Sequence, residues 1–139
     1  MSKVVNTTSK NLKTFAQRRV QMVKNLVADT AVNIEIQATR DAPRGFINID
    51  KQFSNKGLTA EVGVMGENDL AAYFEFGTGL SAKEILSSYP QYVKDLAYQF
   101  YINGEGTLKG KPYLFPAVFR YTKEFERELK RLNDTNVNG

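Results

Sequence analysis

The chain has 139 residues, the length of one ordinary domain, and its 42% hydrophobic and 24% charged residues indicate a globular protein. It contains no cysteine and no histidine, which excludes disulfides, thiolate chemistry, Ser-His-Asp triads and imidazole metal ligands. No apolar run approaches the ~20 residues that cross a bilayer, and the N-terminus lacks the apolar core of a signal peptide. We therefore expect synthesis in the cytoplasm and no membrane partner.

The net charge of +4 is concentrated at the N-terminus. Residues 1–40 contain seven basic and two acidic side chains, whereas the other 99 residues contain twelve basic and thirteen acidic ones. Such a segment is either a solvated helix face or a surface for DNA or an acidic partner. The candidate partner-facing residues are Lys10, Lys13, Arg18, Arg19 and Lys24.

Two long helices are predicted, one near each end of the chain. Apolar residues from Leu12 to Ile34 recur at intervals of three and four, which predicts a helix from about residue 9 to about Ala38. Pro43 prevents its continuation. The same spacing predicts a C-terminal helix that follows Pro116 and extends to Leu132. We expect residues 1–8 and 133–139 to be flexible tails.

Between these helices the sequence predicts a small sheet and an inserted helical segment. The ranges 46–53, 58–64 and 70–76 have strand composition and short polar connections, which favours an antiparallel β-meander with one face on the long helix. Helical pieces are expected at 81–86 and after Pro90, before a glycine-rich loop at 103–111. The predicted fold is a single α+β domain, 1–139, in which a long N-terminal helix packs on the meander.

Patterns for enzymatic chemistry are weak. The glycine-rich segment Gly104–Lys111 differs from a phosphate-binding loop, because Pro112 stands where a Ser or Thr would ligate magnesium. Glu67, Asp69 and Glu75 would suit a carboxylate-dependent hydrolase, but two of them lie in a polar loop where solvated carboxylates are common. We predict a protein that is not an enzyme, with no catalytic residue, cofactor site or metal site.

Two segments together resemble a known family. Tyr73–Gly79 resembles the Tyr-x-Glu-Phe-Gly-Thr-Gly signature of the minor tail component, or tail completion, proteins of long-tailed bacteriophages. Lys111–Ala117 is similar to the Pro-Phe-Leu-x-Pro-Ala segment that follows it in that family. The order of the predicted elements also agrees, although the stretch between the two segments is longer than usual. The motif residues are Tyr73, Glu75, Phe76, Gly77, Thr78, Gly79, Pro112, Leu114, Pro116 and Ala117.

The resemblance implies a structural virion protein that is made in the host cytoplasm. Such a protein would be a tail completion or head–tail connector subunit in the phage neck, and it would form a ring around the DNA exit channel. The implied partners are further copies of the chain, in a hexamer rather than a dodecamer, together with neighbouring neck, connector and tail-tube or terminator proteins. DNA in the channel is a further, non-specific partner. Two alternatives are a free-standing nucleic-acid-binding module that uses the basic helix and, with less support, the hydrolase.

The pairing of the two segments also predicts a local structure. We expect the corner Gly77–Gly79 to pack near the segment Pro112–Pro116, which begins the C-terminal helix. Glu75 would then accept hydrogen bonds from nearby backbone N–H groups and act as a structural anchor rather than as a catalyst.

Overall fold

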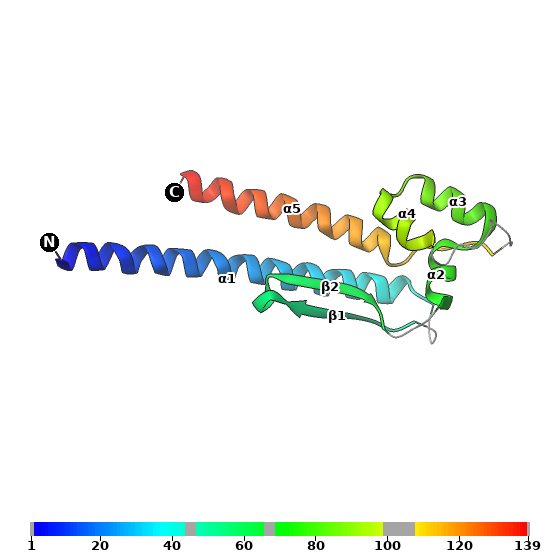
Figure 1. Cartoon of the computed structure of the whole chain (residues 1–139), viewed down its shortest axis with the longest axis horizontal. Helices are drawn as coiled ribbons and strands as arrows, with labels where there is room; N and C mark the ends of the chain where they lie inside the picture. The colour runs from blue at the N-terminus through cyan, green and yellow to red at the C-terminus, as the bar shows by residue number, and fades with distance from the viewer. Residues whose placement is uncertain (1, 44–46, 66–68, 99–107, 139) are drawn as a thin grey trace.

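The computed structural model describes residues 2–43, 47–65, 69–98 and 108–138, with side chains described for 12–43, 47–65, 71–97 and 108–134. The chain has the predicted α+β architecture (Figure 1). The elements are α1 (Ser2–Asp41), β1 (Ile49–Ser54), the 3-10 turn η1 (Asn55–Gly57), β2 (Thr59–Val64), α2 (Asp69–Phe76), α3 (Gly79–Ser87), α4 (Gln91–Tyr98) and α5 (Phe115–Asn138).

Helices α1 and α5 run antiparallel and form the long axis of the molecule (Figure 1). At one end Ala117 packs with Ile34 and Ala38, and at the other Arg19 donates a hydrogen bond to Asn133 at 2.6 Å. Both helices are longer than predicted, since α1 begins at Ser2 and α5 ends at Asn138. The described parts of the expected tails, 2–8 and 133–138, therefore continue the helices. The apolar pattern ends before the helical backbone does, so it could not indicate these boundaries.

The sheet is a two-stranded hairpin that covers one side of α1. In its antiparallel register Ile49 pairs with Val64, Lys51 with Val62 and Phe53 with Ala60, which places these residues on the face toward α1. The residues between them are polar apart from Gly63, so the outer face suits solvent. Lys51 also donates to Glu35 of α1 at 2.7 Å, and this hydrogen bond raises the pKa of Lys51.

The predicted third strand is wrong, because residues 69–76 form helix α2. In a helix Ala71 and Glu75 share one face and Ala72 and Phe76 share the next, so the two faces pack against different parts of the core. The strand prediction used alternation of Phe74 and Phe76 with their neighbours. A short apolar run fits both periods, and tertiary contacts decide between them.

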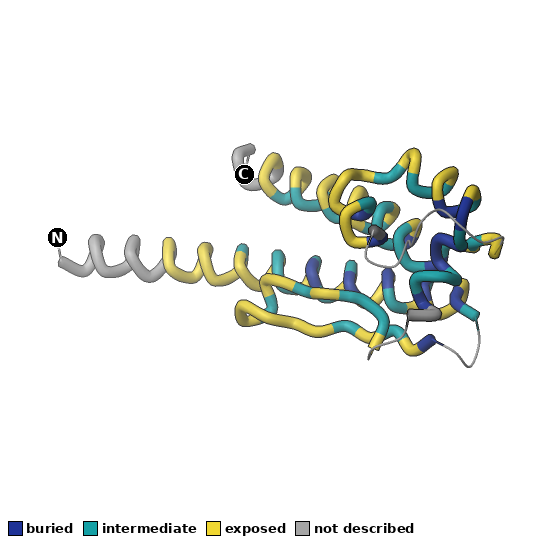
Figure 2. Tube along the Cα trace, turned by 45° about the vertical axis from the view of Figure 1, so that its right-hand side comes forward, coloured by how far each residue is buried: buried dark blue, intermediate teal, exposed yellow. Residues whose placement is uncertain are grey.

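Buried residues gather where α2, the C-terminal half of α1 and the start of α5 meet (Figure 2). The core consists of three adjoining clusters. One lies between α1 and α5, one joins the hairpin to Ala71 and Tyr113, and one lies among α2, α3, α4 and α5. By contrast, every side chain from Leu12 to Met22 of α1 is exposed except the half-buried Arg19.

Candidate functional site

Glu75 is a buried carboxylate at the end of α2, with only 2% of the residue exposed. Its Oε2 accepts hydrogen bonds from the backbone N–H groups of Tyr113 at 2.8 Å and Leu114 at 3.0 Å. Its Oε1 accepts the N–H of Phe115 at 2.9 Å. Phe115 is the first residue of α5, so Glu75 caps a helix that begins 40 residues further along the chain. The predicted acceptor role of Glu75 is confirmed.

The segment that precedes α5 is bound to α2 and α3 through its backbone. Three further hydrogen bonds run from the N–H of Leu108 to Thr78 Oγ1 at 2.9 Å, from that of Gly110 to Ser81 Oγ at 2.9 Å, and from that of Lys111 to Phe74 O at 2.8 Å. In return, the N–H of Thr78 donates to Leu108 O at 2.8 Å. We call residues 74–81 and 108–115 together the α2–α5 joint.

Two glycines allow the backbones of the joint to touch. Gly77 has a φ of +75°, and a Cβ atom there would lie 2.3 Å from the backbone nitrogen of Gly110. A Cβ atom on Gly110 would lie 2.2 Å from the carbonyl carbon of Phe76. Gly77 also pairs with Lys109 in an isolated antiparallel bridge. Any side chain at Gly77 or Gly110 would separate the two segments.

Aromatic rings fill the space on one side of the joint. Phe76 stacks on Phe115 with ring centroids 5.8 Å apart, and Tyr89 contacts Phe119 edge to face at 5.2 Å. Such pairs add to the stability that the burial of the rings provides. Burial and, secondarily, the charge of Glu75 raise the pKa of Tyr89 to about 12, so its hydroxyl stays neutral near pH 7.

On the other side, Tyr113 is almost completely buried and its hydroxyl donates to Ala71 O at 2.8 Å. Burial and the charge of Glu75 both raise the pKa of Tyr113. The hydroxyl is therefore neutral near pH 7 and can donate this bond. Tyr113 therefore ties the start of α5 to the first half of α2 as Glu75 ties it to the second.

The electrostatics of Glu75 reflect two opposing effects. Burial raises the pKa of its carboxyl above the ordinary value, and the three backbone N–H donors oppose that rise. The positive end of the α5 dipole also favours the ionised form. A general base must reach a proton of the substrate, whereas both oxygens of Glu75 bind backbone amides. This geometry suits Glu75 as a structural anchor better than as a general base.

The structure brings the two motif segments together. Thr78 binds Leu108 with its hydroxyl rather than capping its own helix, α3, and Gly79 begins that helix with a φ of +56°. Pro116 lies in the first turn of α5, where its missing N–H costs nothing, and Ala117 is buried between α5 and α1. Tyr73, Pro112 and Leu114 are partly buried around the joint.

Several residues of this site lie outside both motifs. Ser81, Leu108 and Gly110 bind the joint, and Tyr89 and Phe119 pack in its aromatic cluster. For Gly110, which falls in the predicted glycine-rich loop, the available signal is its place directly before the Lys111-Pro112 segment. The remainder of that predicted loop, up to residue 107, lies outside the described residues.

The basic residues of α1 do not form one surface. Arg19 bonds to Asn133 of α5, whereas the stem of Lys24 lies over Gly57 of the hairpin turn, about 140° around the helix. Lys13 is exposed and lies about 20° around the helix from Lys24, whereas Arg18, also exposed, is about 140° from Lys13. The side chain of Lys10 lies outside the described residues. The predicted DNA-facing set is therefore divided among different faces of α1.

Across the described residues, no three or more acidic side chains are grouped so that they could hold a metal ion. No helix within the described ranges has the length and hydropathy to span a bilayer. Glu67 lies outside the described ranges, as does the side chain of Asp69, so the predicted carboxylate group is represented only by Glu75. No protein-family model, curated protein or solved structure matches the chain.

Proposed function

We propose that the chain is a structural subunit of the neck or tail of a long-tailed bacteriophage. In this role it completes the tail or joins head to tail, and copies of it form a ring, a hexamer in preference to a dodecamer, around the DNA channel. The proposal implies a place in the virion and neighbours among the neck, connector and tail-tube or terminator proteins. It also implies no catalytic role.

One observation carries the proposal. The two sequence segments that resemble tail completion proteins are brought together by Glu75, whose carboxylate binds three consecutive amides at the start of α5. The glutamate of the first segment therefore has its physical partner in the second. A shared structural unit of this kind explains why both segments would be needed together. The contact between the two segments therefore supports a family resemblance rather than two coincidental sequence similarities.

The nucleic-acid-binding alternative has less support. Binding to phosphates would need a continuous basic surface, and Arg18 and Arg19 lie on other faces of α1 than Lys13 and Lys24 do. The hydrolase alternative depends on Glu75, whose two oxygens are bound to backbone N–H groups. Contacts with DNA in the channel remain part of the proposal as a secondary, non-specific interaction.

Labelled particles test the proposal. The chain has no cysteine, so Ser54→Cys, an exposed position at the tip of the hairpin, gives one site for a gold label. In phage particles that carry the labelled chain, electron microscopy should show a ring of gold at the junction of head and tail. Particles with the wild-type chain, treated in the same way, are the control. Label that is absent from purified particles, or scattered over the capsid, would contradict the proposed function.

A further inference from the structure

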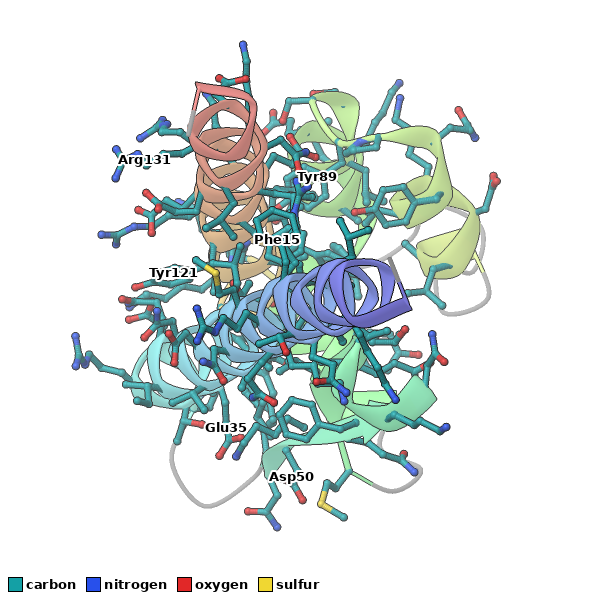
Figure 3. The ribbon with its side chains drawn as sticks, turned by 90° about the vertical axis from the view of Figure 1, so that its left-hand side faces the viewer. Phe15, Glu35, Asp50, Tyr89, Tyr121 and Arg131 are labelled. Atoms are coloured by element: carbon teal, nitrogen blue, oxygen red, sulfur yellow. The ribbon has the colours of Figure 1, made fainter. Side chains whose placement is uncertain are left out.

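Residues 12–22 of α1 include an apolar stripe whose large side chains are substantially exposed. Leu12 is 64% exposed, Phe15 is 49% exposed and Met22 is 45% exposed. They lie within about 80° of one another around the helix. Figure 3 shows Phe15 on the α5 side of α1, opposite Glu35, which points toward the sheet. We call residues 12–22 the free end of α1.

An open apolar groove lies elsewhere on the same chain. It has a volume of about 360 Å³ and lies between β2 and α5, with α1 as its floor. Its apolar lining includes Val27, Ala31 and Ile34 of α1, Leu58 and Ala60 of the hairpin, and Phe125 of α5. The polar side chains that line it are three threonines. Small-molecule sites usually add convergent polar or charged groups that fix the ligand, so this groove suits an apolar segment of protein better.

The free end cannot fill the groove of its own chain. Both belong to the one continuous helix α1, and Phe15 is 12 positions before Val27, the first floor residue, or about 18 Å along the axis. A second copy has no such restriction. Because the free end and the groove are different surfaces, their contact would be heterologous, and heterologous contacts that close produce rings.

The charges around the two surfaces are complementary. Lys13 and Arg18 flank the apolar stripe of the free end, and both are exposed. Glu126 of α5 is exposed one helical turn after Thr122, which lines the groove. None of these three side chains is in an ion pair with another described residue. A basic apolar helix end therefore meets an apolar groove that has a carboxylate at its α5 edge.

We propose that the free end of α1 of one copy packs into the groove between β2 and α5 of the next copy. Leu12 and Phe15 provide the apolar contact, and Lys13 and Arg18 bring positive charge to the α5 edge of the groove, where Glu126 lies. The inference rests on the proposed ring assembly and identifies the surfaces that build the ring. It also explains why a 40-residue helix extends beyond the core that it supports.

Disulfide trapping tests this contact, because the wild-type chain has no cysteine. One preparation carries Phe15→Cys and a second carries Thr122→Cys, which lines the groove on α5. After mixing and mild oxidation, a Phe15→Cys/Thr122→Cys heterodimer should form readily, since a disulfide needs Cβ atoms about 4 Å apart. The matched control is Lys123→Cys, the next residue of α5 but about 100° away from the groove. It should cross-link several-fold less.

Reversing the charges on the two cysteine-bearing chains provides a second test of the contact. Glu126→Lys on the Thr122→Cys chain should reduce cross-linking to the level of the Lys123→Cys control. Lys13→Glu with Arg18→Glu on the Phe15→Cys chain should restore it. Equal cross-linking at Thr122→Cys and Lys123→Cys, or no effect of charge reversal, would overturn the contact. Gold rings in particles whose chains lack this cross-link would leave the function intact and refute only the contact. A cross-link without virion label would refute only the function.

Discussion

The two ends of the molecule differ in how completely their side chains are packed against the rest of the chain. At the α2–α5 joint, six backbone N–H groups between Leu108 and Phe115 are bound by residues 74–81. Glycines allow backbone contact there, and aromatic rings fill the remaining space. At the free end of α1, by contrast, Leu12, Phe15 and Met22 remain 64%, 49% and 45% exposed. A packed end stabilises the fold, whereas an uncovered apolar end is typical of a surface that binds another molecule.

The largest contrast is expected between two phenylalanines. Phe76→Ala should lower the free energy of unfolding by about 4 kcal/mol, because it removes a buried ring from the aromatic cluster and leaves a cavity. Phe15→Ala should change it by less than about 1 kcal/mol, since the ring is half exposed. Urea unfolding followed by circular dichroism measures both. Equal costs would mean that the free end is packed as tightly as the joint.

The glycines provide the next test. Gly77→Ala should lower the free energy of unfolding by about 3 kcal/mol. The residue has a positive φ, and its Cβ atom would clash with the backbone of Gly110. Gly63→Ala in β2 is the control, since its Cβ would have no neighbour within 4 Å. It should change the free energy of unfolding by about 0.5 kcal/mol or less. The comparison would fail if Gly77→Ala proved as mild as Gly63→Ala.

Glu75→Gln should lower the free energy of unfolding by about 2.5 kcal/mol. The amide has one acceptor oxygen, and its NH₂ group would oppose a backbone N–H that now has no partner. Glu84→Gln, at an exposed position on α3, is the control and should be nearly neutral. If the two substitutions were equally neutral in thermal and urea unfolding, Glu75 would not be an anchor.

A smaller effect concerns pH. Burial raises the pKa of Glu75, so the folded chain keeps this proton to a higher pH than the unfolded chain does. Between these two pKa values the folded state binds more protons, and its stability falls as pH rises. The free energy of unfolding of the wild type relative to Glu75→Gln should therefore decrease with pH above the ordinary carboxyl range. An increase over that range would show that the backbone donors outweigh burial.

Sequence periodicity was sufficient for the longest elements and insufficient for the shortest. The repeat from Leu12 to Ile34 predicted α1, and alternation from Ala60 to Val64 predicted β2, because each pattern covers several periods. Residues 69–76 are too few to separate a strand from a helix, and the packing of Phe76 with Phe115 decides between them. The partner of Glu75 was predictable once two motif segments were compared together.

The rest of the joint left no local pattern in the sequence. Ser81 binds the amide of Gly110, 29 residues away, through a single hydroxyl, and a serine at the start of a helix is common for other reasons. The groove likewise depends on the distance between β2 and α5, and the described chain between them includes α2, α3 and α4. Contacts of this kind arise from tertiary geometry.

Sedimentation velocity of the purified wild-type chain tests the central claim, that the packed end is an anchor and the free end is for assembly. With increasing protein concentration, we predict conversion of monomer into one closed oligomer whose sedimentation coefficient stops rising. Phe15→Glu should stay monomeric and unfold at the same urea concentration as the wild type. A wild-type chain that remains monomeric at every concentration, or a Phe15→Glu chain that assembles as the wild type does, would contradict the account.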